Sequence, residues 1–338
     1  MLSIAIVTAI VVTAIALARS GIVAPAAASP SAVPSHVAAA AASDTVGPAQ
    51  PTATVATAPA TATPAVSATE TPTAMPTTPP LPGLLAAIGD SYSQAYAVSP
   101  QYRYDHPEFS WVVGTSPSDG VISLLERFRA LGASPVVVDA ATSGRKMNDA
   151  PRQAALVVAA AKKLPSGQAA YVTFELGTND LCDFPMTGLA PFQQELSSAL
   201  ATLRAGLPDG SRILMLALPD FPHFHDMTQA DPKTRAALLV LRPSNCPPYL
   251  GADPRTTFAS SNYYLSKYDD ILEAACDGMS ATGTPAVICT YDSALLAESD
   301  FVSTDLGTYD YFHPSLTGQA KMAAAAWQAG AWSSMPLP

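Results

Sequence analysis

The chain has 338 residues, of which 49% are hydrophobic, so it is long enough for one sizeable folded domain or two small ones. Its 17 basic residues are outnumbered by 27 acidic ones, which gives a formal net charge of −10. Because binding to phosphates needs a clustered Lys and Arg surface, this balance argues against nucleic acid, and against an anionic membrane surface, as a partner.

The first segment, residues 1–20, contains an apolar run from Leu2 to Ala18 that ends at Arg19. Its length lies between that of a secretory signal core and that of a membrane-spanning helix. Residues 26–28 are all alanine and offer a cleavage site of the A-x-A type, which favours a signal peptide. A retained N-terminal membrane anchor is the alternative. Both alternatives predict an exported protein, which is either secreted or held at the cell surface. Tethering to the membrane or cell wall would be through this N-terminal segment.

Residues 21–82 are dominated by Ala, Pro, Thr and Ser and contain no Phe, Tyr or Trp. Prolines remove backbone donors and small side chains bury little area. The ordering entropy of about 1–2 kcal/mol per residue is therefore not offset. We expect a disordered linker over 21–82, followed by a folded domain over 83–338.

From residue 84 onward, short runs rich in Val, Ile and Leu alternate with longer amphipathic stretches, which predicts an α/β fold with a mostly parallel central sheet. The runs are continuously apolar, as in strands that helices cover on both faces. Five strands are expected, over Leu84 to Ile88, Pro135 to Asp139, Tyr171 to Leu176, Arg212 to Leu218 and Ala286 to Cys289. Helices are expected over Val121 to Leu131, Arg152 to Lys163, Phe192 to Ala205, Tyr263 to Ala275 and Leu316 to Ala329.

Helix ends and one long connection can also be predicted. Ser118 is expected to cap the start of the first helix, and Gly132 its end. Residues 220–260 are rich in Pro, Asn and Asp, which indicates a loop region with one short helix around Thr234 to Leu241.

The four cysteines all fall in the region that is expected to fold. Their even number, an exported chain and the absence of a C-x-x-C pair favour two disulfides over a zinc site. Of the three connectivities we favour Cys276 with Cys289, which closes a short loop, and Cys182 with Cys246. Buried free thiols are the alternative.

Short polar blocks follow the expected strands, where the carboxyl ends of a parallel sheet hold ligands. The blocks are Gly89-Asp90-Ser91-Tyr92-Ser93, Ala141-Thr142-Ser143-Gly144, Gly177-Thr178-Asn179-Asp180 and, before the last helix, Asp310-Tyr311-Phe312-His313-Pro314-Ser315.

Over roughly Leu84 to Trp332 these blocks resemble those of the SGNH/GDSL hydrolase superfamily. The resemblance implies a three-layer α/β/α, flavodoxin-like fold and a catalytic triad. Ser91 is the implied nucleophile, His313 the base that takes its proton, and Asp310 the acceptor that fixes the histidine tautomer. The first block has Tyr92 where the commonest pattern has Leu, which changes a residue beside the nucleophile but removes no catalytic group.

The resemblance also implies an oxyanion hole, formed by the backbone N–H groups of Ser91 and Gly144 and the side-chain amide of Asn179. Taken singly, each residue has a structural explanation: a turn glycine, a loop cap or a satisfied histidine. Four blocks in the right order favour the catalytic interpretation. No cofactor and no metal are expected.

Other residues leave alternatives open. The cluster Asp220, His223, His225 and Asp226 contains an H-x-H and could bind a metal, although such residues more often belong to a substrate loop. Glu175, at the end of a buried strand, receives no role. Several aromatic residues either line a pocket for an acyl group or sugar or pack in the core; they are Tyr92, Tyr96, Phe221, Phe224 and Tyr311.

The function expected from these patterns is that of an exported serine esterase. Its substrate would be a small-molecule, lipid acyl or carbohydrate O-acyl ester. The alternatives are a non-catalytic carbohydrate- or lipid-binding module on the same scaffold, and an O-acyltransferase. Specificity is expected to reside in residues 95–120 and 220–260, whose conformation the sequence does not give.

Overall fold

The computed structural model describes residues 78–116, 118–241, 246–250, 258–281, 287–293 and 301–336. The expected signal or anchor at 1–20 lies outside the described residues, and so does the expected linker up to residue 77. None of the helices in the described ranges has the length and apolar character needed to cross a membrane.

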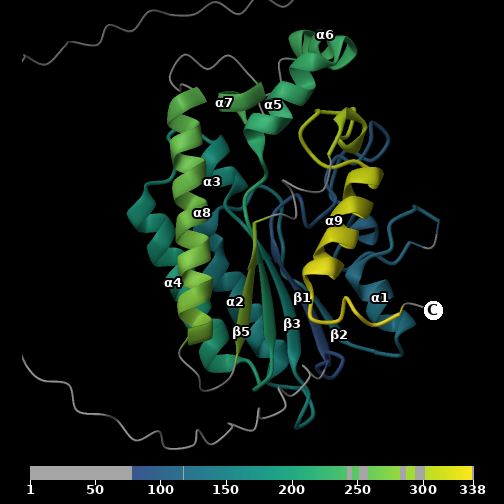
Figure 1. The fold of residues 1–338 in the computed structure, drawn as a ribbon, viewed down its shortest axis with the longest axis vertical. Helices are drawn as coiled ribbons and strands as arrows, with labels where there is room; N and C mark the ends of the chain where they lie inside the picture. Colours follow the sequence, from purple (N-terminus) through teal and green to yellow (C-terminus); the bar gives the residue numbers. More distant parts are fainter. Residues whose placement is uncertain are drawn as a thin grey trace, which may run out of the picture. The chain divides into compact units, whose positions relative to one another are not determined.

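A single five-stranded sheet forms the centre of the domain (Figure 1). Its strands are β1 (Leu84–Gly89), β2 (Val136–Asp139), β3 (Ala170–Glu175), β4 (Arg212–Leu216) and β5 (Ile288–Asp292). They lie in the order β2-β1-β3-β4-β5, and every neighbouring pair is parallel. The predicted parallel sheet is therefore confirmed. In this order the connections change direction beside β1, which is where open α/β sheets bind their ligands.

The central strands β1 and β3 are buried along their whole length, as continuous apolar runs predict. The prediction that helices cover both faces of each strand is wrong for β2, where Val136 is 51% and Val137 is 38% exposed. The reason is position, because β2 is an edge strand and the helices cover the sheet less completely there. An apolar run alone does not distinguish an edge strand from a central one.

Helices cover both faces of the sheet, which gives the predicted three layers (Figure 1). One face carries α1 (Leu124–Ala130) and α9 (Leu316–Ala329), and the other carries α2 (Ala150–Ala161), α4 (Leu189–Gly206) and α8 (Phe258–Ala281). These are the five helices that the sequence predicts, with ends that differ by a few residues. Short 3-10 turns occur at Pro107–Phe109, Met147–Asp149 and Ser303–Asp305.

The start of α1 differs from the prediction. Ser123, not Ser118, is the N-cap: its hydroxyl accepts from Glu126 N at 3.1 Å, and the Glu126 carboxylate accepts from Ser123 N at 3.0 Å. This reciprocal capping box satisfies two backbone donors and so outcompetes the earlier serine. Gly132 follows the C-cap residue Leu131 and has φ of +89°, a left-handed conformation that glycine adopts readily.

The segment 220–260 is more helical than expected. It contains α5 (Phe221–Ala230), α6 (Pro232–Leu241) and α7 (Pro247–Leu250), and only α6 corresponds to the one predicted helix. The described prolines of this segment occupy first helical turns, where the missing N–H has no intrahelical partner in any case; they are Pro222, Pro232, Pro247 and Pro248. They therefore begin helices where the sequence suggested loops. The three helices follow β4 at the end of the sheet where its strands terminate (Figure 1).

Two disulfides join the four cysteines in the favoured pairing. Cys182, the last residue of α3 (Thr178–Cys182), is bonded to Cys246, and Cys276 on α8 is bonded to Cys289 on β5. The second bridge closes a short stretch of chain, whereas the first spans a sequence separation of 64 residues. The first bridge thus connects α3 to the start of the segment that carries α7.

Candidate active site

Two of the polar blocks meet because the strands before them are neighbours in the sheet. β1 and β3 pair in register from Leu84 with Ala170 to Gly89 with Glu175, so the residues that follow them leave the sheet side by side. Ser91 lies just after β1, and Asn179 lies in α3 just after β3. The fourth block lies immediately before α9 and brings His313 to the same place.

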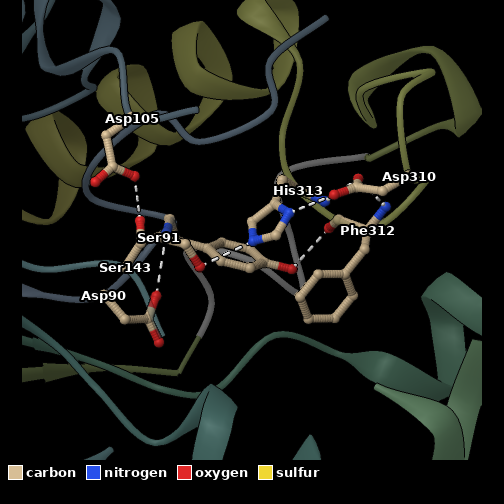
Figure 2. A network of polar contacts seen from close by, with 8 residues as sticks. Asp90, Ser91, Asp105, Ser143, Asp310, Phe312 and His313 are labelled. Atoms are coloured by element: carbon tan, nitrogen blue, oxygen red, sulfur yellow. Dashed lines mark hydrogen bonds and ion pairs between the residues drawn. The ribbon is translucent and has the colours of Figure 1, made fainter. Parts of the chain in front are cut away.

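Ser91, His313 and Asp310 form a continuous hydrogen-bonded relay (Figure 2). The Ser91 Oγ lies 2.8 Å from His313 Nε2, and His313 Nδ1 lies 2.7 Å from Asp310 Oδ2. All three residues are buried. The structure thus brings together the three side chains that the sequence singles out, in the order expected for a nucleophile, a base and an orienting carboxylate.

A tight turn holds the carboxylate of Asp310 in place. Its Oδ1 accepts from the backbone N–H groups of Phe312 at 3.0 Å and His313 at 3.1 Å. Tyr311, which follows Asp310 in the chain, has φ of +55°, a left-handed conformation that is uncommon for a residue with a side chain. Gly307 N donates to His313 O at 2.7 Å and closes the turn. The D-x-x-H spacing therefore lets one carboxylate bind both the backbone and the imidazole.

Tyr92 connects the block of the nucleophile to the block of the base. Its hydroxyl donates to the carbonyl of Phe312 at 2.9 Å, and its side chain is fully buried. Of the two roles left open for Tyr92, a pocket wall or core packing, the structure shows core packing. The tyrosine in place of the common leucine thus adds a bond between segments far apart in the sequence.

Three buried glutamines, which sequence analysis missed, hold the backbone around the nucleophile. Gln153 binds both polar groups of Gly89, accepting from N at 2.8 Å and donating to O at 3.0 Å. Gln94 donates to Ala141 O at 3.1 Å, and Gln319 donates to Tyr92 O at 3.0 Å. Gln153 and Gln319 have a detectable signal: they fall on the apolar faces of α2 and α9, where a polar residue needs a buried partner.

Two of the three expected oxyanion donors are available. In the part of the chain that the structure describes, the backbone N–H groups of Ser91 and Gly144 donate to no protein acceptor. The third donor is engaged: Asn179 Nδ2 lies 3.0 Å from Asp90 Oδ2 and 2.9 Å from the carbonyl oxygen of Arg145. Both protons of this amide therefore have an acceptor.

Two carboxyl groups lie buried beneath the nucleophile, Asp90 with no exposed surface and Glu175 with 2%. Burial raises the pKa of Asp90 to about 7, against the lowering effects of the Tyr92 N–H and of His313. Burial and the charge of Asp90 raise the pKa of Glu175 well above its ordinary value. Repulsion between neighbouring carboxylates, added to desolvation, disfavours a second negative charge here.

A cavity of about 320 Å³ opens beside Ser91. Its walls include Tyr96, whose ring lies 4.8 Å from that of His313, and Phe312. Both cysteines of the Cys182–Cys246 bridge line it as well. Of the aromatic residues considered for a pocket, only Tyr96 lines this cavity, whereas Phe221 and Phe224 are buried in the core.

The histidine cluster after β4 lies apart from this cavity. Asp220 accepts from His223 N at 3.0 Å and caps α5, and the His223 ring nitrogen Nε2 lies 3.1 Å from Phe301 O. His225 pairs with the exposed Asp226 at 3.1 Å. Across the described ranges, His, Cys, Asp and Glu side chains form no group of three or more that could hold a metal ion. Helix capping and local pairing account for these residues.

Comparison with known proteins agrees with this geometry. A family model described as GDSL-like lipase/acylhydrolase matches residues 85–326, which is most of the chain. The chain belongs to this family. It is therefore a carboxylic ester hydrolase of the SGNH/GDSL type, and the match covers the blocks of Ser91, Gly144, Asn179 and His313.

The solved structures to which the chain is similar have low sequence identity to it. A crystal structure of TesA is 20% identical over 73% of this chain and 97% of its own, with a TM-score of 0.42. The esterase EstA from Pseudoalteromonas sp. is 17% identical over 73% of this chain and 96% of its own, with a TM-score of 0.40. The SGNH-hydrolase family esterase AlinE4 is 20% identical over 75% of this chain and 97% of its own, with a TM-score of 0.36. No curated protein matches the chain significantly. Because these TM-scores lie below 0.5, the family assignment rests on the sequence match.

The two disulfides of this GDSL-type domain are expected to affect activity differently. Replacing both Cys182 and Cys246 with alanine should raise KM and lower kcat, because this bridge forms part of the cavity wall and ends the helix that carries Asn179. The matched control is Cys276→Ala with Cys289→Ala, which should leave kcat and KM nearly unchanged. The chain-entropy relation predicts stability losses of about 4 kcal/mol and about 3 kcal/mol respectively.

The two double variants are compared by steady-state kinetics on a p-nitrophenyl ester and by chemical denaturation. Equal effects of the two pairs on kcat and KM would show that the Cys182–Cys246 bridge matters only for stability.

Proposed function

We propose that this chain is an exported serine esterase that uses Ser91, His313 and Asp310 as a catalytic triad and passes through an acyl-enzyme intermediate. The observation that carries the proposal is the unbroken relay from Ser91 Oγ to Asp310 Oδ2, next to a cavity into which Ser91 and Gly144 present unused backbone donors. A weak nucleophile, a base in contact with it and prearranged donors are what ester cleavage requires.

In the first half of the reaction, Ser91 Oγ forms a bond to the ester carbonyl carbon while its proton moves to His313 Nε2. The carbonyl π electrons move to oxygen, and the resulting oxyanion receives hydrogen bonds from Ser91 N and Gly144 N. When the tetrahedral intermediate collapses, the bond to the leaving alcohol breaks and His313 returns the proton to it. Asp310 stabilises the imidazolium while it exists.

In the second half, water loses a proton to His313 and attacks the acyl carbon of the ester on Ser91. The oxyanion forms again at the same donors. Its collapse releases the carboxylic acid, and the proton on His313 returns to Ser91 Oγ. One ester and one water thus give one acid and one alcohol, and the protein ends unchanged.

The cavity favours an ester with a small acyl group. Its volume of about 320 Å³ is at the low end of the range for ligand pockets, and both hydroxyl and aromatic side chains line it, among them Ser143 and Tyr96. Lipid acyl and carbohydrate O-acyl esters both remain within the proposed substrate class. Hydrolysis of p-nitrophenyl esters of increasing chain length, beside acetylated polysaccharides, separates them.

Export is supported by the two disulfides, since such bonds persist in oxidising compartments. The apolar run at residues 1–20 is the proposed signal or anchor. Fractionation of cells that express the full chain tests this, because an exported domain is found in the medium or at the cell surface with no free thiols.

The catalytic proposal is tested by a fluorophosphonate, which reacts with an activated serine hydroxyl and loses fluoride. We expect one phosphonyl group per chain, located by peptide mass spectrometry on Ser91, together with loss of p-nitrophenyl acetate hydrolysis. A folded protein that remains unlabelled and hydrolyses no ester, yet binds polysaccharide or lipid vesicles, would be the non-catalytic binding module. Acyl transfer is distinguished by comparing products with and without an acceptor sugar.

A further inference from the structure

The relay of Ser91, His313 and Asp310 leaves unexplained the two buried carboxyl groups beneath it. Glu175, the last residue of β3, places Oε2 3.0 Å from Ser93 Oγ and 3.5 Å from the backbone N of Asp90. Its other oxygen, Oε1, is buried and receives no hydrogen bond from a donor among the described residues. A buried carboxylate oxygen without a donor is costly, whereas a protonated oxygen can itself donate, here to the neighbouring Asp90.

Asp90 lies between Glu175 and the oxyanion hole. One carboxylate oxygen, Oδ1, accepts from Tyr92 N at 3.0 Å, and the other, Oδ2, accepts from Asn179 Nδ2 at 3.0 Å. The contacts thus run from Glu175 through Asp90 to Asn179, the residue whose amide is expected to stabilise the oxyanion.

The pair has no Lys or Arg partner: no described Lys or Arg forms a salt bridge with Asp90 or Glu175. The other charges that act on Asp90 are His313, which lowers its pKa, and Asp180, which raises it. Two adjacent carboxylates in such a site cannot both be ionised at moderate cost. The raised pKa values of both groups agree with this. Both oxygens of Asp90 accept hydrogen bonds from N–H groups, whereas Glu175 Oε1 accepts none, so Glu175 is the partner that carries the proton.

We propose, on the basis of the proposed esterase function, that Asp90 and Glu175 are positioning residues: ionised Asp90 holds the amide of Asn179 in the orientation that the oxyanion requires, and protonated Glu175 holds Asp90. Neither touches the substrate. Glu175 accepts from Ser93 Oγ and from Asp90 N with Oε2, and its own proton serves the carboxylate of Asp90.

The two N–H bonds of the Asn179 amide have different roles in this arrangement. The bond to Asp90 lies in the partly buried interior and fixes the plane of the amide. The bond to Arg145 O is exposed, and Asn179 is one of the residues that line the cavity. The second N–H is therefore the one that exchanges its carbonyl acceptor for the oxyanion as negative charge develops. A charged acceptor such as Asp90 keeps the first N–H in place during that exchange.

A double-mutant cycle tests the path from Asp90 to Asn179. Asp90→Asn keeps an oxygen for Tyr92 N but turns an NH2 group toward the amide of Asn179, so two donors face each other. We expect kcat on p-nitrophenyl acetate to fall about 10²-fold with KM nearly unchanged, because the oxyanion exists only beyond the ground state. Asn179→Ala should lower kcat by about 10²- to 10³-fold, and the double variant should be within about threefold of Asn179→Ala.

The matched control is Asp269→Asn on α8. Asp269 is a partly buried carboxylate that accepts from Leu218 N at 2.9 Å and does not line the cavity beside Ser91. It reports the effect of removing a buried carboxylate on kcat when Asn179 is not involved. Thermal unfolding of each variant separates misfolding from lost activity.

The proton on Glu175 is tested by two substitutions of similar size. Glu175→Leu leaves Ser93 Oγ and Asp90 N without an acceptor and should lower kcat toward that of Asp90→Asn. Glu175→Gln provides an oxygen for those two donors and an NH2 group for Asp90, as a protonated carboxyl does. We expect the kcat of Glu175→Gln to be at least 10-fold higher than that of Glu175→Leu.

Two results would overturn the inference: losses from Asp90→Asn and Asn179→Ala that multiply in the double variant, or a Gln variant that folds but is as slow as the Leu variant. If Glu175→Leu does not fold, the double-mutant cycle still tests the inference. Glu175→Gln is then compared with wild type, and its kcat is expected to lie within about 10-fold of the wild-type value. Failure of the esterase proposal has a different signature, namely a wild-type protein without ester hydrolysis and without fluorophosphonate labelling at Ser91.

Discussion

Ser91→Ala is expected to reduce kcat for ester hydrolysis by about 10⁶-fold, the scale seen when the nucleophile of a serine hydrolase is removed. No other hydroxyl replaces it. Ser93 Oγ points to Glu175, and Ser143 Oγ is hydrogen-bonded to Asp105 (Figure 2). The fold should survive, because Ser91 Oγ has His313 as its hydrogen-bond partner and the change removes one oxygen from the cavity wall.

The measurement is the hydrolysis of p-nitrophenyl acetate and butyrate under saturating conditions, with circular dichroism to show an unchanged fold. Ser123→Ala is a matched control: it removes the cap of α1 and should cost about 1 kcal/mol of stability without changing kcat. Turnover by Ser91→Ala at the wild-type rate would exclude Ser91 as the nucleophile.

The second large effect is expected for Asp310→Asn, with a loss in kcat of about 10⁴-fold. The amide oxygen of Asn can still accept from Phe312 N and His313 N, so the turn before α9 is retained. The amide NH2, however, faces His313 Nδ1 and favours the tautomer that carries its proton on Nε2. That tautomer cannot accept the proton of Ser91 Oγ, which lies 2.8 Å away.

This prediction is checked by comparing kcat with the rate of fluorophosphonate labelling, because both depend on a base at His313 Nε2. They should fall together, while the unfolding temperature changes little. A loss of less than 10-fold in both rates would show that Asp310 does not select the tautomer, even though it binds the imidazole at 2.7 Å.

Much of this fold and site could be predicted because the relevant signals are local. The strands are continuous apolar runs, and the residues after a strand are placed by the strand itself, so Ser91 and Asn179 could be assigned to one edge of the sheet. The pairing of Cys276 with Cys289 follows from the short chain between them. The resemblance of the four blocks to those of the SGNH/GDSL hydrolases assigns His313, three residues after Asp310, as the expected base.

What could not be predicted depends on contacts between distant segments. The hydrogen bonds of Gln319 to Tyr92 and of Glu175 to Ser93 join residues that no short pattern relates. The helices α5 and α7 are not predicted for another reason: proline breaks a helix in its interior but favours its first turn, and composition does not say which position applies. The choice between Ser118 and Ser123 is different, because only Ser123 has a Glu three residues later, and this local capping-box pattern identifies the N-cap from sequence.

The in-register pairing of β1 with β3 has an implication for how enzymes of this kind diversify. The spacing between the strand ends that bear Ser91 and Asn179 is a property of the backbone ladder, and about 80 intervening residues can lengthen, shorten or change composition without altering it. New substrate preferences can therefore be acquired in the surrounding loops while the chemistry stays constant, since scaffold and selectivity are encoded in separable parts of the chain.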